Sequence, residues 1–230
     1  MFESTLFKST RAAVDAVRPN GGIVVLTHDQ AVGKSMSARL LKSQLPDSTR
    51  SVSAFPGMTA AAAMLEVAAA FGEHATSMRD ANRLVTKAVV TENTVLVVDN
   101  VHLAAGPLCD LSRYLVETEG NRCTILLLGK GTCAPVKSLV ASRPDLVKQV
   151  VRARPLGGDD LLRELRRWRP IFHNADDSVL LHMDELCGHG LLSAWDAIGR
   201  VAEELLPLSG EPGITVKLAK AIIEAMRRRR

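Results

Sequence analysis

The chain has 230 residues, a formal net charge of +4, 47% apolar residues and 23% charged residues. This length accommodates one α/β domain and a small helical domain, and this composition is that of a soluble globular protein. No apolar run approaches the ~18 residues that span a bilayer, and the first residues lack the apolar core of a secretory signal. We therefore expect a cytoplasmic protein without a membrane partner. The four cysteines show neither CxxC pairing nor zinc spacing, which predicts reduced, buried thiols.

Apolar periodicity predicts alternating strands and helices over the first 157 residues. Short runs rich in Val, Ile and Leu are typical of buried parallel strands, and segments with helical periodicity lie between them. The predicted strands are residues 23–26, 51–55, 94–98, 124–128 and 149–154. The predicted helices are residues 6–17, 34–45, 59–71, 77–90, 106–119 and 135–142. Such alternation implies right-handed βαβ crossovers and a parallel sheet that helices cover on both faces.

The pattern changes after the turn Pro155-Leu156-Gly157-Gly158. Only helical patterns follow: a helix that Asp159-Asp160 is expected to cap and that runs to Trp168, and then residues 178–187, 191–206 and 215–226. We therefore predict an α/β domain over residues 1–157, a small all-α domain over residues 158–226 and a basic tail over residues 227–230. A closing run of arginines is most often a solvated tail, and it would also bind polyanions without sequence selectivity.

A phosphate-binding loop of the P-loop pattern follows the strand predicted at residues 23–26. Its second half, Gly33-Lys34-Ser35, is intact: the glycine lets backbone N–H groups turn toward phosphate, the lysine reaches the β- and γ-phosphates, and the serine hydroxyl binds Mg²⁺. His28 stands in place of the first glycine, a position that often needs an unusual backbone angle. A chance Gly-Lys-Ser before an amphipathic helix is the alternative. The predicted nucleotide-binding residues are His28, Asp29, Gln30, Ala31, Val32, Gly33, Lys34, Ser35 and Met36.

A second motif, four apolar strand residues followed by Asp99, has the Walker B form. Ligands bind at the carboxyl end of parallel strands, where Asp99 would hold the hydration shell of Mg²⁺ and hydrogen-bond Ser35. An Asp that caps a helix at a strand end is the alternative. Asn100 follows, where many P-loop ATPases have a Glu that orients the attacking water; an amide positions water but cannot accept its proton. We therefore predict that the chain binds ATP and Mg²⁺ and hydrolyses ATP slowly, unless His102 or a residue of another subunit substitutes.

The order of motifs resembles a known family. An N-terminal helix precedes GGIVVLTHDQAVGKS, and then come FPGMTAAAAMLEVAAAFGEHATSMRDANRLVTKAV, TVLVVDNVHLA, CTILLLGKGT and VVRARPLGGDDLLREL. This looks like the AAA+ ATPases of the TniB/TnsC/MuB transposition group, with the ExeA-type ATPases as relatives, over about residues 5–205. The resemblance implies an AAA+ domain with a helical lid. It also implies ATP-dependent assembly into rings or helical filaments on double-stranded DNA, which recruit a transposase and mark target sites.

The resemblance also assigns residues that would complete the site. The polar residue expected after the fourth strand falls at Lys130 or Thr132, where Asn, Thr or Gln is commoner. For the arginine that acts on a neighbouring subunit's nucleotide, the candidates are Arg143, Lys148 and Arg152, of which Arg143 is favoured. The arginine expected in the lid has no clear counterpart in residues 188–191. These departures put hydrolysis in doubt more than binding, and the predicted catalytic residues are Asp99, Asn100, Lys130 and Arg143.

A stripe of basic side chains is the predicted DNA contact. Arg79, Arg83 and Lys87 are four residues apart and so share one helix face, in the part of the ATPase domain that supplies the family's DNA-facing residues. Contacts of this kind go to phosphates and give sequence-independent, salt-sensitive binding. A solvated helix face is the alternative. A second cluster is interpreted as the polar face of a connecting helix: Arg163, Arg166, Arg167 and Arg169.

Three functions stay open at this point. The leading hypothesis is a DNA-binding AAA+ regulator of transposition, a form of DNA recombination, that is ATP-bound when it assembles. The second is a helicase loader or replication-initiation ATPase, for which an extension that binds the helicase is expected before the ATPase core. The third is a nucleotide-binding scaffold with impaired hydrolysis, as His28 and Asn100 permit.

Overall fold

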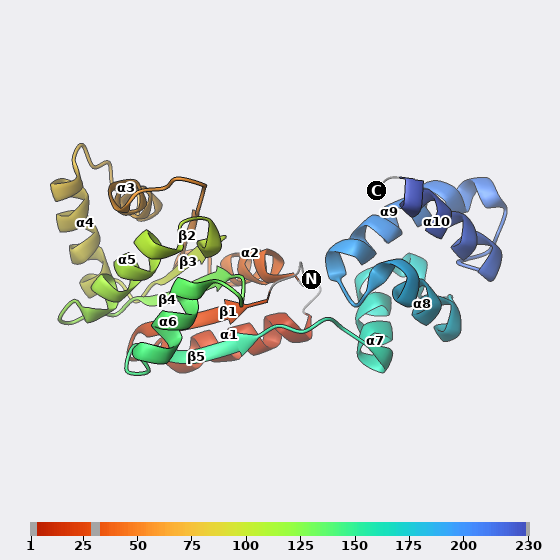
Figure 1. The fold of residues 1–230 in the computed structure, drawn as a ribbon, viewed down its shortest axis with the longest axis horizontal. Helices are drawn as coiled ribbons and strands as arrows, with labels where there is room; N and C mark the ends of the chain where they lie inside the picture. The colour runs from red at the N-terminus through yellow and green to blue at the C-terminus, as the bar shows by residue number, and fades with distance from the viewer. Residues whose placement is uncertain (1–3, 29–32, 229–230) are drawn as a thin grey trace. The chain divides into compact units, whose positions relative to one another are not determined.

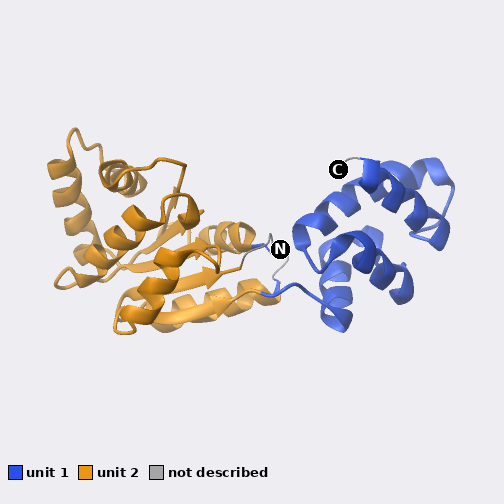
Figure 2. Cartoon of the chain, viewed as in Figure 1, with its two compact units in different colours: residues 1–4, 30–33, 154–230 blue, residues 5–29, 34–153 orange. Residues whose placement is uncertain are grey.

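The structure, a computed structural model, describes residues 4–28 and 33–228. Two compact units make up the chain (Figure 2): unit 2 holds residues 5–29 and 34–153, and unit 1 holds residues 1–4, 30–33 and 154–230. The main division falls between Ala153 and Arg154, and the first helix after it begins at Gly158. Each unit has an apolar core of its own.

Unit 2 is built on a five-stranded parallel sheet with the strand order β2-β3-β4-β1-β5 (Figure 1). Its strands are β1 (Gly22–Thr27), β2 (Thr49–Ser53), β3 (Val95–Asp99), β4 (Thr124–Gly129) and β5 (Val147–Arg152). The three inner strands are runs of Val, Leu and Ile and are buried almost throughout, as strands between two helical layers must be. The α/β class and the parallel sheet predicted from the sequence are confirmed.

Helices cover both faces of this sheet. One layer consists of α3 (Ala60–Ala70), α4 (Met78–Thr91), α5 (Ala105–Glu117) and α6 (Ala134–Ser142). These helices share one apolar cluster with alternate strand residues such as Val25, Val98 and Leu127. The intervening strand residues, such as Leu26, are buried outside that cluster and face α1 (Thr5–Val17) and α2 (Lys34–Gln44), because side chains alternate along a strand.

The ends of the two edge strands differ from those predicted. β2 and β5 each lie two residues earlier than the predicted strands at residues 51–55 and 149–154. The carbonyl of Ser48 accepts from the N–H of Val95 (2.7 Å), and the N–H of Ala54 donates to the carbonyl of Asp99 (2.9 Å), so pairing with β3 fixes both ends of β2. The ends are invisible in the composition because these strands mix polar and apolar residues, whose strand preference depends on context.

Unit 1 is helical throughout its described part. Its elements are α7 (Gly158–Trp168), the 3₁₀ turn η2 (Pro170–Phe172), α8 (Asp177–Met183), the π-helical turn η3 (Asp184–Gly188), α9 (Leu192–Ser209) and α10 (Val216–Arg228). The prediction that Asp159-Asp160 caps α7 was wrong. The N-cap is Gly157, without a side-chain bond, and both carboxylates lie inside the first turn, where they favour the positive end of the helix dipole.

The glycines around His189 serve the packing of unit 1. Oδ1 of Asp184 accepts from the N–H of Gly190 (2.7 Å) and from Nε1 of Trp195 (2.8 Å). A Cβ atom on Gly188 would lie 2.5 Å from both this carboxylate oxygen and this indole nitrogen. Trp195 is fully buried and meets Phe172 edge to face, with ring centroids 5.3 Å apart. The turn therefore joins the π-helical segment to the aromatic core.

Cys109, Cys123 and Cys187 are buried and Cys133 is half-buried, and all four are free thiols. Burial raises the pKa of the Cys109 and Cys123 thiols to about 12.

Across residues 4–28 and 33–228, none of the helices has the length and apolar character needed to cross a membrane.

Candidate functional site

The carboxyl ends of the strands in unit 2 form one edge of the sheet. β1 and β4 are neighbours at this edge, and the N–H of His28, just after β1, donates to the carbonyl of Gly129 at the end of β4 (3.3 Å). The helix after β1 is α2 and the helix after β4 is α6, and they cover opposite faces of the sheet. In open α/β sheets, ligands bind at the point where successive helices switch faces. The phosphate-loop motif lies at this point.

Lys34 is the first residue of α2 and reaches back over the end of β1. Its ammonium Nζ donates to the carbonyl of His28 at 2.7 Å. Gly33 has φ of 92°, a left-handed conformation that glycine adopts without strain. His28 is not among the described non-glycine residues with positive φ, which are Asn100 and His189, so it is accommodated without the unusual angle expected at this position. The predicted residues Asp29, Gln30, Ala31 and Val32 lie outside the described residues.

Asp99 and Asn100 form the end of β3. Oδ1 of Asp99 accepts from the backbone N–H of Asn100 (2.7 Å). Asn100 adopts the left-handed conformation (φ 57°, ψ 31°), which asparagine tolerates better than most residues. Its side-chain Nδ2 donates to Oγ of Ser53 (3.4 Å), so the amide joins the ends of β3 and β2. The sequence identified the residue, but its backbone conformation was not predicted.

His102, in the 3₁₀ turn η1 (Val101–Leu103), lies among the charged groups of this edge. Burial lowers its pKa below the ordinary 6.5, and the positive charges of Lys130 and Lys34 lower it further, while Asp99 opposes them. His102 is therefore neutral at pH 7. Its Nδ1 is buried and has no hydrogen-bond partner among the described residues. The structure thus brings together Lys34, Asp99 and Lys130, as the sequence predicts, and adds His102, which the sequence indicated only as a substitute base.

Oxygen ligands for a metal are present at the same edge. Asp99 uses one carboxylate oxygen for the Asn100 N–H, and within the described part of the chain its other oxygen has no hydrogen-bond partner. The hydroxyl of Ser35, in the first turn of α2, also has none there. A carboxylate and a hydroxyl are hard oxygen donors of the kind that Mg²⁺ prefers, together with its own waters. The donor set fits Mg²⁺. Met36, the next residue, is 56% exposed.

Arg143 lies at the opposite edge of the sheet, next to the start of β5. Its guanidinium binds Asp145 through two hydrogen bonds (3.0 and 2.8 Å) and Glu117 through a third (2.5 Å). Parallel strands begin at one edge and end at the other, so Arg143 cannot reach Lys34 or Asp99 of its own chain. Of the predicted catalytic residues, it alone is separated from the rest.

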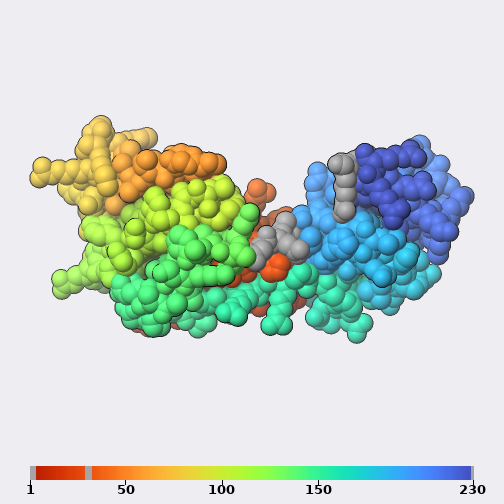
Figure 3. Space-filling model, viewed as in Figure 1, coloured from red at the N-terminus to blue at the C-terminus, as the bar shows by residue number. Residues whose placement is uncertain are grey.

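The basic stripe on α4 is exposed. Arg79, Arg83 and Lys87 all stand in solvent, and the residues of α4 form an outer surface of unit 2 (yellow in Figure 3). Arg83 pairs with Asp80 one turn earlier (3.0 Å), a contact that is worth little at the surface. The opposite face of α4 packs into the core through Ala81, Val85 and Val89. The stripe is therefore available to a ligand, and it is not part of the edge that carries Lys34.

Solved structures share this fold over nearly the whole chain. The Aeropyrum pernix ORC2 protein in its ADP form has a TM-score of 0.65 and 13% identity, covering 96% of this chain and 67% of that one. CDC6P of Pyrobaculum aerophilum has a TM-score of 0.60 and 15% identity, covering 90% and 62%. The RuvB Holliday junction branch migration motor of Thermotoga maritima has a TM-score of 0.60 and 13% identity, covering 97% and 72%. The chain thus spans about two thirds of the length of these proteins.

No curated protein matches the sequence. The family described as AAA domain matches residues 17–135, which is more than half of the chain and includes β1 through β4 with Lys34, Asp99 and Lys130. The match and the strand order agree on one fold, and on that evidence the chain belongs to the AAA domain family.

Proposed function

We propose that the chain binds MgATP at the edge formed by β1, β3 and β4, and that it hydrolyses ATP slowly. The observation that carries the proposal is the position of Lys34 at the N-terminal end of α2. Its ammonium donates to the carbonyl of His28 at 2.7 Å. Phosphate binding favours a cation at the start of a helix, and Lys34 is the first residue of α2. The Aeropyrum pernix ORC2 protein, which shares this fold, was solved in an ADP form and in ADPNP–ADP complexes, which supports a nucleotide at this site.

The roles of the residues follow from their chemistry. Lys34 would exchange its bond to the His28 carbonyl for bonds to the β- and γ-phosphates. Ser35 and Asp99 would hold Mg²⁺ and its waters, and the ion would supply positive charge to the phosphate oxygens. Lys130 adds positive charge at the end of β4. Arg143 would act on the nucleotide of a neighbouring copy, after release from the carboxylates of Glu117 and Asp145.

Slow hydrolysis follows from the absence of a carboxylate at position 100. The amide of Asn100 is bonded to Ser53, and an amide does not take up the proton of an attacking water. His102 is the alternative base, because its lowered pKa keeps it neutral at pH 7. The neighbouring cations that lower this pKa also weaken it as a base. We therefore expect ATP to persist after binding.

The finer proposal is that the chain is a transposition regulator of the TniB/TnsC/MuB group. In this proposal ATP-bound copies assemble as a ring or helical filament on duplex DNA and present the target site to a transposase. The order of motifs and the exposed stripe Arg79, Arg83 and Lys87 support it. A helicase loader or initiation ATPase, or a scaffold that binds nucleotide without DNA, would share the nucleotide site and differ in partner.

The nucleotide proposal is tested by titrating MgATP into the full chain and into Lys34→Ala. Loss of measurable binding is expected, because Lys34 is the cation that would contact the β- and γ-phosphates. Lys137→Ala, an exposed lysine on α6, is the matched control and should bind as the unmodified chain does. Equal affinity of the Lys34→Ala variant and the control would refute the site.

The DNA proposal is tested by the anisotropy of a labelled duplex at several salt concentrations. Replacing Arg79, Arg83 and Lys87 together by Ala should weaken binding equally for any duplex sequence. Each lost phosphate contact should reduce the slope of log affinity against log salt by about 0.9. A control that also removes three positive charges elsewhere on unit 2, at the exposed Lys8, Arg122 and Lys137, should keep the slope. An unchanged slope in the α4 variant would refute this assignment.

A further inference from the structure

The outer edge of β2 presents backbone groups that no strand of the described chain uses. β2 is the last strand of the sheet and pairs only with β3. The carbonyl of Ser48 and the N–H of Ala54 both point to β3. In a parallel strand, the backbone N–H and C=O groups of successive residues point alternately to one side and to the other. The N–H and C=O groups of Thr49, Ser51 and Ser53 therefore point away from β3. Thr49 is buried, whereas Ser51 and Ser53 are exposed and form an open edge.

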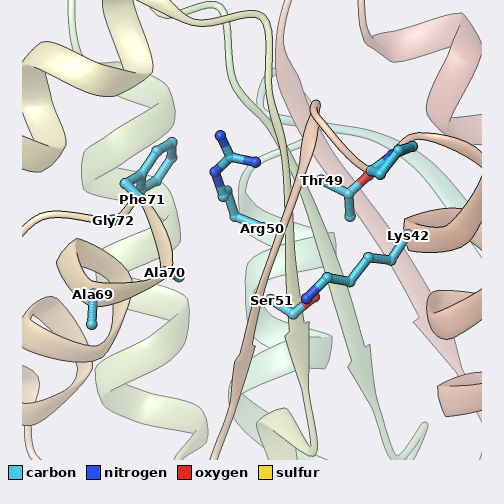
Figure 4. A pocket seen from close by; sticks show the side chains of 9 residues that line it. Lys42, Thr49, Arg50, Ser51, Ala69, Ala70, Phe71 and Gly72 are labelled. Carbon is cyan, nitrogen blue, oxygen red and sulfur yellow. The ribbon is translucent and has the colours of Figure 1, made fainter.

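A pocket of about 400 Å³ opens at the start of this edge (Figure 4). Three consecutive residues of β2, Thr49, Arg50 and Ser51, line it together with the ends of α2 and α3. Side chains of consecutive strand residues point to opposite faces, so they can share a pocket only at the edge of the sheet. Figure 4 shows Lys42 extending from α2 toward Ser51 on one side of the strand, with Phe71 on the other. The pocket therefore straddles the open edge.

The polar groups of this pocket favour an anion. Lys42 is exposed, and no residue of the described chain forms an ion pair or hydrogen bond with its ammonium. The guanidinium of Arg50 donates to the carbonyl of Asp47 (2.9 Å) and lies 3.8 Å from a carboxylate oxygen of Glu92, which leaves most of its donors unused. Oγ1 of Thr49 is buried and has no partner among the described residues. Acceptors that carry negative charge would suit Lys42 and Thr49 on one face of the strand and Arg50 on the other.

The helix beside the edge is apolar on its exposed side as well. α3 has the sequence AAAAMLEVAAA, in which Glu66 is the one polar residue. A helix that is apolar all round is normally covered on all sides. Within the described chain, however, Leu65 is 38% exposed and Ala69, one turn later, is exposed too. Phe55, just beyond the end of β2, is 44% exposed. Alanines at this face let another backbone approach the edge closely.

We propose that the outer edge of β2 binds an extended, acidic segment of a partner protein, which adds to the sheet as a sixth strand. Its backbone would pair with the outward groups of Ser51 and Ser53, and its acidic side chains would meet Lys42 on one face of the sheet and Arg50 on the other. Its apolar side chains would pack on the exposed side of α3. Main-chain bonds then provide affinity, and the charged pocket provides selectivity for acidic sequences. This docking site does not depend on the nucleotide site proposed above.

The test selects a displayed library of random ten-residue peptides on the full chain. In the selected peptides, acidic residues should alternate with apolar residues. The peptides should bind without nucleotide. Ser51→Pro removes an N–H that points away from β3, so the sheet is retained while the added strand loses a bond. Lys42→Glu reverses the charge at position 42 and cancels that of Arg50 in the pocket. Each variant should lower the affinity of a selected peptide about tenfold, and Lys137→Glu on α6 should leave it unchanged.

Amide hydrogen exchange gives a second readout that does not depend on the folding of a variant. Peptide binding to the unmodified chain should slow exchange at Ser51 and Ser53, because their N–H groups become paired. Selection of basic or neutral peptides, or no enrichment, would overturn the proposal. So would a peptide affinity in Ser51→Pro and in Lys42→Glu that equals the affinity of the unmodified chain, or unchanged exchange at both serines. Duplex DNA or a second copy of the chain that displaces the peptide and loses its own binding in Lys42→Glu would assign the edge to that ligand instead and overturn it too.

Discussion

Asn100 carries two separable properties, a left-handed backbone and an amide in place of a carboxylate, and a series of substitutions measures each. Most L-residues lose about 1–2 kcal/mol in this conformation, while glycine loses none of it and Asn or Asp lose less. Asn100→Ala should therefore lower the free energy of unfolding of unit 2 by about 1 kcal/mol. Most of this loss is the steric cost of the left-handed backbone, because the hydrogen bond to Ser53 that is also lost is long (3.4 Å) and weak. Asn100→Gly should stay within about 0.5 kcal/mol of the unmodified chain.

The carboxylate variants test the chemistry at the same position. A positioned general base accelerates proton transfer by about 10²–10⁴-fold. Asn100→Glu should therefore raise the single-turnover rate of ATP hydrolysis by about 10²-fold. Because Glu shares the backbone cost of Ala, its stability should match that of Asn100→Ala, so the gain in rate cannot come from a more stable site.

The assays are chemical denaturation for stability and phosphate release from enzyme in excess over ATP for the rate. Equal stability of Asn100→Ala and Asn100→Gly would refute the left-handed conformation at this residue. A hydrolysis rate in Asn100→Glu that equals the unmodified rate, with ATP still bound, would refute the idea that Asn100 limits turnover. The two results are independent, because the stability comparison tests the backbone conformation and the rate comparison tests proton transfer from the attacking water.

Three further predictions concern other parts of the chain. The pKa of His102 is lowered on folding, so the unfolded state takes up a proton first as the pH falls below 6.5. Stability should therefore drop from pH 6.5 downward through the folded pKa, and His102→Gln should flatten this part of a denaturation–pH profile. Gly188→Ala should destabilise unit 1 by about 1–3 kcal/mol, because its Cβ meets a carboxylate and an indole at 2.5 Å, whereas Gly213→Ala, whose Cβ would meet only Asn174 at 3.9 Å, should change thermal unfolding little. Alkylation at pH 8 followed by mass spectrometry should label the half-buried Cys133 first, and fast labelling of Cys123, whose pKa is about 12, would contradict the buried position.

The strands inside the sheet were predictable because burial on both faces demands continuous apolar runs. Residues 94–98 and 124–128 show this clearly, and β3 and β4 are found there within one residue at each end. The edge strands were misplaced by two residues because their ends depend on partners: Ser48 and Ala54 belong to the pairing of β2 with β3, and nothing in their own type reveals it. Similarly, the start of α7 is set by a glycine turn, not by the acidic pair that follows it.

The candidate site was predictable as far as motifs carry it. Asp99 ends β3 and Lys34 begins the helix after β1, so the topology alone brings them to the carboxyl ends of the parallel strands. The electrostatic role of His102 could not be predicted, because its pKa depends on its burial and on Lys130, which is distant in sequence and close in space. The open edge of β2 was equally hidden, since strand order decides which strand lacks a neighbour.

The central claim is that nucleotide works as a switch for assembly and is consumed slowly. Mass photometry of the chain with duplex DNA tests this most directly, with ATP, with ADP and with the Lys34→Ala variant in ATP, while phosphate release is followed in the same sample. We predict large DNA-bound assemblies in ATP that form before much phosphate appears, and none in ADP or with Lys34→Ala. Assemblies of equal size in ADP, or in the Lys34→Ala variant, would contradict the claim.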